Sequence, residues 1–170
     1  ASINLIRNGR SLNFLIADDN EINLFLASSI IEKFNGTSVC VSDGIEAIAA
    51  LKENSFDAIL MDIQMPRMDG IAALREIRKM PSPAAEIPVI AISAFASEQE
   101  KSMARDAGAQ SYISKPYFPE DLLKAISELF NDKTAKGAEQ TPETEEIVVK
   151  SDASGLKQIN RSELELRVLK

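Results

Sequence analysis

Residues 56–70 have the sequence FDAILMDIQMPRMDG, in which an apolar run ends on an aspartate. The run at residues 58–61 contains no polar residue, as expected for a strand that is buried on both faces of a parallel sheet. Asp62 follows the run directly and is expected just past the end of this strand. The same pattern, a short apolar run followed by a polar residue, recurs on both sides of this segment.

Further apolar runs predict strands at residues 14–17, 38–41, 89–92 and 112–114. Between the strands, apolar residues recur at helical spacing; in the first such segment they include Ile22 and Phe25. A segment at residues 97–107 is weaker, since Met103, Ala104 and Ala107 are its only apolar contacts. It is therefore a candidate for movement.

Residues that cap or open helices precede each helical segment: Asn20, Ser42 or Asp43, Asp69, Ser97 and Pro119. The order of elements is then βα repeated five times. Such alternation predicts an α/β fold in which an open parallel sheet carries helices on both faces.

Length and composition limit the alternatives. The chain has 170 residues, 45% of them hydrophobic, which suits one domain and something smaller. A net charge of -7 argues against direct contact with nucleic acid. No apolar run is long enough to cross a membrane and no secretion signal is visible, so we expect a cytoplasmic segment without membrane contact. Cys40, between Val39 and Val41, is predicted to be a buried, reduced thiol.

The predicted boundaries divide the chain into four parts. Residues 1–12 form an N-terminal extension and residues 13–130 the main domain. Residues 131–146 have no large apolar side chain and are predicted to be a linker. Residues 147–170 form a short C-terminal appendage, either two strands or the start of a further domain. The chain begins with alanine, so it is also a candidate fragment of a longer protein.

Polar residues follow four of the predicted strands: Asp18, Asp19, Asp62, Ser93 and Lys115. Because the carboxyl ends of parallel strands meet at one sheet edge, these side chains are expected to lie together. Three neighbouring carboxylates repel one another unless a cation is present, and Mg²⁺ or Mn²⁺ suits an all-oxygen site. Zinc is excluded in practice, since the sequence has no histidine and one cysteine.

Such a site is suited to phosphoryl transfer, which depends on positioning and charge neutralisation. Asp62 is the best candidate for the acceptor nucleophile because it is expected at the centre, while Lys115 and Ser93 can bind phosphate oxygens. Each residue alone has a simpler explanation: Asp18 as a helix cap, Asp62 as a strand end, Ser93 as a core hydroxyl. Their joint placement at one edge favours the functional interpretation.

Five ordered segments carry a family resemblance: FLIADDNEIN, FDAILMDIQMPRMDG, VIAISAFA, AGAQSYISKP and the last helix. Over residues 13–130 the sequence resembles the receiver domains of response regulators, and most closely those of hybrid histidine kinases and phosphorelay proteins. The resemblance implies a CheY-like, flavodoxin-like (βα)5 fold, doubly wound, with strand order 2-1-3-4-5.

The resemblance also implies residue roles. Asp62 would be phosphorylated, Asp19 would bind the metal ion directly, and Asp18 would act largely through water. The backbone carbonyl of Gln64 would be a further metal ligand. Lys115 corresponds to the lysine of the family pattern, and its bond to Pro116 is expected to be cis.

The resemblance also assigns four residues to switching and to the lifetime of the phosphoaspartate. Ser93 matches the switch hydroxyl and Tyr112 the aromatic switch position. Gln64 and Phe95 occupy positions that control water access during dephosphorylation. The bulk of Phe95 predicts slow autodephosphorylation.

The implied partners are a histidine kinase or a histidine phosphotransfer protein as phosphodonor, and a downstream protein. The downstream partner would bind a surface made by the helix at Ser97, the strand at Tyr112 and the last helix, and a phosphorylation-linked dimer is a further expectation. The domain would not be a stand-alone turnover enzyme, although its parent could be a hybrid kinase, membrane-anchored with this part in the cytoplasm.

Three alternatives stay open. A phosphorylation-silent pseudo-receiver would be a protein-binding module, and the retained Asp18, Asp62 and Lys115 count against it. An aspartate-nucleophile phosphatase would need an Asp-x-Asp motif after the first strand. A flavin protein would need a Ser/Thr/Gly-rich phosphate loop there, where this chain has ADDNEIN.

Overall fold

The strands and helices follow the predicted alternation. The computed structural model describes residues 4–95 and 97–135. Its strands are β1 (Ile6–Arg7), β2 (Arg10–Ser11), β3 (Asn13–Ala17), β4 (Thr37–Val41), β5 (Ala58–Asp62), β6 (Val89–Ser93) and β7 (Ser111–Ser114). Its helices are α1 (Glu21–Lys33), α2 (Gly44–Glu53), α3 (Gly70–Arg78), the 3-10 turn η1 (Ala84–Glu86), α4 (Glu98–Ala107) and α5 (Pro119–Ala135).

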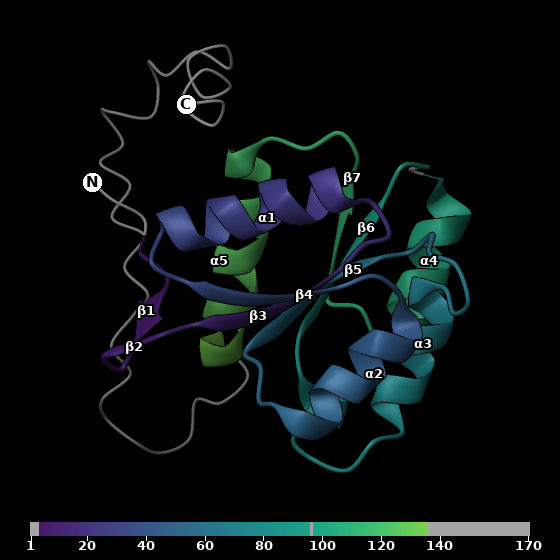
Figure 1. The fold of residues 1–170 in the computed structure, drawn as a ribbon, viewed down its shortest axis with the longest axis horizontal. Helices are drawn as coiled ribbons and strands as arrows, with labels where there is room; N and C mark the ends of the chain where they lie inside the picture. Colours follow the sequence, from purple (N-terminus) through teal and green to yellow (C-terminus); the bar gives the residue numbers. More distant parts are fainter. Residues whose placement is uncertain (1–3, 96, 136–170) are drawn as a thin grey trace.

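Five strands form one parallel sheet in the order β4-β3-β5-β6-β7 (Figure 1). Counted within this sheet, the order is 2-1-3-4-5, which confirms the prediction. Strand β3 pairs on one side with the edge strand β4 and on the other with the central strand β5, in register at Ala17 with Val41 and Met61. The carboxyl ends of β3 and β5 therefore lie side by side.

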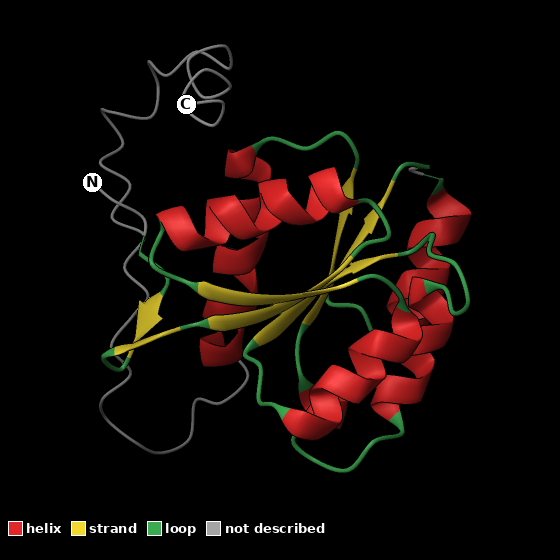
Figure 2. Ribbon diagram, viewed as in Figure 1, coloured by secondary structure: helices red, strands yellow, loops and turns green. Residues whose placement is uncertain are grey.

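The helices form two layers, with α1 and α5 on one face of the sheet and α2, α3 and α4 on the other (Figure 2). Alternate residues of β3 enter the two cores: Phe14 and Ile16 pack with α1 and α5, and Leu15 and Ala17 with the other layer. Both faces of the strand are thus buried, which explains why its sequence is continuously apolar.

The predicted caps hold the starts of the helices. Asn20, Asp43, Asp69 and Ser97 each accept a hydrogen bond from a backbone N–H in the first turn of their helix. Of the two candidates for α2, the cap is Asp43, and the N–H of Ser42 donates instead to Glu46 at 2.7 Å. These caps fix where the chain turns from strand edge to helix.

The predicted burial of Cys40 is wrong, and two apolar residues at helical spacing lie outside the core. Cys40 is exposed, because β4 is an edge strand of the sheet. Ile22 and Phe25 have the spacing of core residues but are 69% and 70% exposed, whereas Ala27, Ile30 and Ile31 supply the buried face of α1. Periodicity identified the helix but not which of its apolar residues contact the sheet.

A hairpin precedes the sheet, where the sequence suggested only an extension. Strands β1 and β2 pair antiparallel around Asn8 and Gly9, both with positive φ, as a tight two-residue hairpin requires. The flanking Leu5 and Leu12 are buried in the core between α1, α5 and the sheet. The hairpin thus packs as part of the described domain.

At the other end, α5 continues to Ala135, into the first residues of the predicted linker. The remainder of that linker and the predicted appendage at residues 147–170 lie outside the described residues. Among the helices that the structure describes, none has both the length and the apolar composition required to cross a bilayer.

Candidate functional site

Three carboxylates meet where β3 and β5 end. Asp18 directly follows β3, Asp19 comes next, and Asp62 is the last residue of β5. One carboxylate oxygen from each lies within 4.8 Å of the others. Asp18 and Asp62 are 5% and 4% exposed, whereas Asp19 is open to solvent. The cluster therefore has two fixed, buried members and one accessible member.

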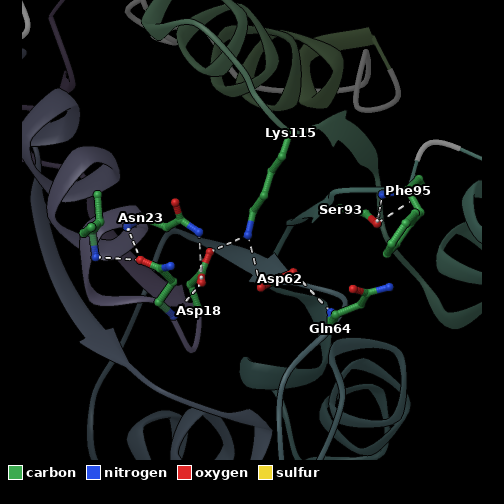
Figure 3. A network of polar contacts seen from close by, with 9 residues as sticks. Asp18, Asn23, Asp62, Gln64, Ser93, Phe95 and Lys115 are labelled. Carbon is green, nitrogen blue, oxygen red and sulfur yellow. Dashed lines mark hydrogen bonds and ion pairs between the residues drawn. The ribbon is translucent and has the colours of Figure 1, made fainter.

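The ammonium of Lys115 lies between the two buried carboxylates (Figure 3). Its Nζ donates to Asp18 Oδ2 at 2.8 Å and to Asp62 Oδ2 at 3.2 Å. The Lys115–Pro116 peptide is cis, as expected. Burial alone would lower the pKa of Lys115, but the contacts with Asp18 and Asp62 outweigh it and raise that pKa. The lysine thus remains charged at neutral pH.

The ammonium of Lys115 does not fully offset the effect of burial on the Asp62 carboxyl. Burial raises the pKa of this carboxyl above its usual value; Lys115 lowers it and the negative Asp18 raises it further. Burial and the charge of Asp18 also raise the pKa of the neighbouring Tyr117 to about 12. The site therefore carries excess negative charge in a partly desolvated place, which a bound cation would relieve.

Asp18 is held by its own loop. Its Oδ1 accepts hydrogen bonds from the N–H of Asn20 at 2.9 Å and from Asn23 Nδ2 at 3.4 Å, while its Oδ2 accepts from Lys115. Both oxygens are engaged, whereas Asp19 is exposed. Asn23, the last residue of the segment FLIADDNEIN, was not among the predicted site residues.

Asp62 is fixed by the loop that follows it. Its Oδ1 accepts from the N–H of Gln64 at 3.1 Å, and the Gln64 side chain is exposed and points away from Lys115 (Figure 3). The chain then folds back tightly, because Gly70 donates to Ile63 O at 2.9 Å. A Cβ on Gly70 would lie 2.1 Å from the Asp62 carbonyl oxygen, so only glycine permits this approach.

Ser93 and Tyr112 form a second group beside the acidic cluster. Ser93, at the end of β6, is fully buried, and its Oγ accepts from the N–H of Phe95 at 3.1 Å. The Tyr112 hydroxyl lies 2.9 Å from Phe95 O and 3.0 Å from Glu100 Oε1. The structure thus brings Asp18, Asp19, Asp62 and Lys115 together, while the Ser93 hydroxyl contacts Phe95 beside this cluster.

This arrangement suits a hard divalent cation. The donors are carboxylate oxygens, within reach of one ion, and Asp19 is accessible to solvent. An open groove of about 840 Å³ begins at Asp19 and Gln64 and runs between α3 and α4, with Met65 and Met103 in its lining. A partner or small molecule can therefore approach the cluster from this side.

Two curated relatives are a probable histidine kinase and a sensor kinase/phosphatase. The chain is 35% identical over 135 residues to probable histidine kinase 6 of Oryza sativa, with 69% of this chain and 14% of the kinase covered. It is 39% identical over 114 residues to the autoinducer 2 sensor kinase/phosphatase LuxQ of Vibrio vulnificus, with 67% of this chain and 13% of the kinase covered. The chain therefore spans only about one seventh of these relatives.

Solved structures show the same fold. A receiver domain of a Pseudomonas aeruginosa sensor histidine kinase, with magnesium coordinated in its active site cleft, is 29% identical; the TM-score is 0.64, with 69% of this chain and 95% of that chain covered. A CheX-CheY-BeF3-magnesium complex from Borrelia burgdorferi is 30% identical, with a TM-score of 0.67 and coverage of 72% and 91%.

The family model of the response regulator receiver domain matches residues 14–127. Apart from Asn13, the first residue of β3, this range contains all five strands of the parallel sheet, and it contains every residue of the acidic cluster. The chain accordingly belongs to the response regulator receiver domain family.

Proposed function

We propose that Asp62 accepts a phosphoryl group from a phosphohistidine of a partner domain or protein, in a reaction that requires Mg²⁺ or Mn²⁺. The observation that carries this proposal is the cluster of three carboxylates within 4.8 Å, with Lys115 bound to two of them. In the transfer, a carboxylate oxygen of Asp62 forms a bond to phosphorus while the N–P bond of the donor breaks. The imidazole leaves with the electron pair. The donor histidine lies outside this sequence, which contains none.

The metal ion would neutralise phosphoryl oxygens and orient them for in-line attack. Asp19 and Asp62 would hold it directly, together with the Gln64 carbonyl. Asp18 would act through water, since its oxygens already accept from Asn20, Asn23 and Lys115. Lys115, released from part of its carboxylate contacts, would bind a phosphoryl oxygen, and Ser93 would donate to another.

A protein phosphodonor can also approach Asp62 over the start of α1, where Ile22 and Phe25 are exposed. Both follow Asp18 and Asp19 closely in the chain, so this apolar pair continues the site. We infer that the histidine-bearing partner, a kinase or a phosphotransfer protein, packs an apolar helix face here. Burial of Phe25 would then contribute to its affinity.

Phosphorylation would switch the surface of α4, β7 and α5. If Ser93 turned toward the phosphoryl group, its contact with Phe95 would break and the environment of Tyr112 would change. Helix α4 buries only Ala104 and Ala107, so it can shift at low cost. A downstream protein or a second phosphorylated copy would bind this surface.

Two exposed residues, Gln64 and Phe95, flank the site and would control water access to the phosphoaspartate. With the bulky Phe95 in this position, autodephosphorylation is expected to be slow. A measured phosphoaspartate half-life of seconds would contradict this expectation. The domain would catalyse its own phosphorylation and dephosphorylation without being a turnover enzyme, as a cytoplasmic part of a hybrid kinase or as a regulator.

The test is incubation with acetyl phosphate and MgCl2, followed by intact-mass measurement of the wild type and Asp62→Asn. A single phosphoryl adduct is expected on the wild type and none on the variant. Chelation with EDTA should abolish the adduct. No adduct on the wild type would favour the silent binding module, and an adduct on both proteins would place the acceptor elsewhere.

A further inference from the structure

The loop at residues 63–69, between β5 and α3, is attached to the start of α2 by an arginine. Arg67 has φ of 61°, a left-handed conformation that is unfavourable for a side chain other than glycine or asparagine. Its Nε donates to Asp43 Oδ2 at 2.6 Å, its Nη2 contacts the same oxygen, and Glu46 Oε1 lies 3.7 Å away. Arg67 thus combines an unusual backbone conformation with side-chain contacts to Asp43 and Glu46.

Asp43 is a rigid anchor for this contact. It is 2% exposed and caps α2, since its Oδ1 accepts from the N–H of Glu46 at 2.9 Å. Its neighbour Gly44 donates to Met68 O at 3.2 Å, so backbone as well as side chain joins the loop to α2. A Cβ on Gly44 would lie 2.9 Å from that same Met68 oxygen, which shows how closely the two segments approach.

The other end of the loop forms part of the site. The N–H of Gln64 donates to Asp62 Oδ1, and Gly70 donates to Ile63 O. Between these points, Met68 donates to Pro66 O at 2.7 Å. The backbone around Gln64 is therefore held between Asp62 on one side and the Arg67–Asp43 pair on the other.

We propose that Arg67 is a positioning residue for phosphoryl transfer, which acts by binding Asp43 and thereby fixing the loop that presents Gln64 to the metal ion. The inference rests on the proposed function, because it needs Gln64 to be a ligand. Mg²⁺ requires nearly ideal octahedral geometry, so displacement of one backbone ligand weakens binding. Misplacement by about 1 Å can cost about 10²-fold in rate.

A purely stabilising ion pair is the simpler interpretation. Arg67 is 58% exposed at its side chain, and exposed pairs usually contribute little to stability. Such a pair would alter the melting temperature and leave the Mg²⁺ dependence unchanged. The experiment must therefore measure metal affinity separately from folding.

The variant is Arg67→Asn, since asparagine tolerates the left-handed backbone but lacks the guanidinium. Arg67→Lys should retain part of the contact. The matched control is Arg10→Asn, which removes an Arg–Asp pair, Arg10 with Asp57, at the opposite edge of the sheet. All proteins are phosphorylated with acetyl phosphate over a range of Mg²⁺ concentrations, and Mg²⁺ affinity is also measured from the shift in melting temperature without phosphodonor.

We expect Arg67→Asn to raise the half-saturating Mg²⁺ concentration about tenfold, which corresponds to about 1.4 kcal/mol, with Arg67→Lys intermediate and Arg10→Asn within twofold of the wild type. The amide resonance of Gln64 should shift in metal-free Arg67→Asn and not in Arg10→Asn. The proposal would be overturned if folded Arg67→Asn had a half-saturating Mg²⁺ concentration within twofold of the wild type and an unshifted Gln64 amide resonance.

Asp43→Asn provides a second route, because asparagine keeps the cap and weakens the contact with Arg67. The double variant, Arg67→Asn with Asp43→Asn, should need no more Mg²⁺ for half-saturation than either single variant does. Additive defects would contradict a shared action. If the wild type forms no adduct at Asp62, the proposed function fails and this role fails with it; if it does and Arg67→Asn behaves identically, only the positioning role fails.

Discussion

At the scale of single residues, Lys115 balances charges that the fold forces together. Its ammonium contacts Asp18 and Asp62, which are buried, so its removal leaves two carboxylates that repel each other. We expect Lys115→Met to lower the free energy of unfolding by about 1–3 kcal/mol without metal, since buried charges lose their partner. Urea titration with EDTA measures this loss.

The same substitution should strengthen Mg²⁺ binding, because a competing cation is gone, while phosphorylation slows. Lys79→Met is the matched control, since the ammonium of Lys79 contacts Glu76 on the protein surface. Thermal shift with increasing MgCl2 would show the larger shift in Lys115→Met. Equal shifts in Lys115→Met and the wild type would contradict the electrostatic account.

Gly70 shows how backbone packing constrains the site. Replacement by alanine would favour the helix by about 1 kcal/mol, but its Cβ would lie 2.1 Å from Asp62 O. Overpacking of this kind costs about 1–3 kcal/mol or more, so the clash outweighs the helical gain. Gly70→Ala is expected to unfold at lower urea concentration and to phosphorylate slowly; increased stability would disprove the close approach. Gly9→Ala, strained but with open space around the Cβ, serves as comparison.

At the scale of elements, a substitution on α1 can test partner docking separately from the phosphorylation chemistry at Asp62. Phe25 is 70% exposed and outside the acidic cluster, so Phe25→Ala should leave stability and phosphorylation by acetyl phosphate unchanged. Transfer from a phosphorylated histidine phosphotransfer domain should slow about tenfold, as for the loss of a contact of about 1.4 kcal/mol. Glu32→Ala, near the far end of α1, is the control. Unchanged transfer in Phe25→Ala would exclude this face as the docking surface.

The ion pair that joins the β1–β2 hairpin to Asp57 should weaken in acid. Arg10 pairs with Asp57 at 2.8 and 2.9 Å, and the N–H of Asn13 donates to the same carboxylate. Burial alone would raise the pKa of Asp57, but these partners outweigh it and lower that pKa. A depressed folded pKa means that the contribution to stability is present above the unfolded pKa of about 3.9 and is lost as pH falls through the folded value.

Asp57→Asn should therefore destabilise the protein by about 1 kcal/mol at pH 7, and progressively less below about pH 4. The measurement is urea unfolding of both proteins from pH 7 to pH 3. A difference that stays constant over this range would show that the charge of Asp57 does not hold the hairpin.

At the scale of the whole molecule, stability is unevenly distributed. Helix α4 buries Ala104 and Ala107, whereas α5, over residues 119–131, contributes six buried apolar residues to the core: Leu122, Leu123, Ala125, Ile126, Leu129 and Phe130. Native-state hydrogen exchange should therefore show amides of α4 exchanging at least about tenfold faster than those of residues 122–130, through local opening. Equal protection would remove the structural basis for a mobile switching surface.

The sequence by itself determined the βα alternation, the helix caps and the candidate site, because apolar runs, capping residues and carboxylates at strand ends are local signals. It also contains Asn8-Gly9, a local hairpin signal. The tertiary structure decided which apolar residues are buried. Cys40 and Phe25 lie outside the core because edge position and helix orientation depend on packing. The Arg67–Asp43 contact, across 24 residues, likewise exists only once the two loops meet at the sheet edge.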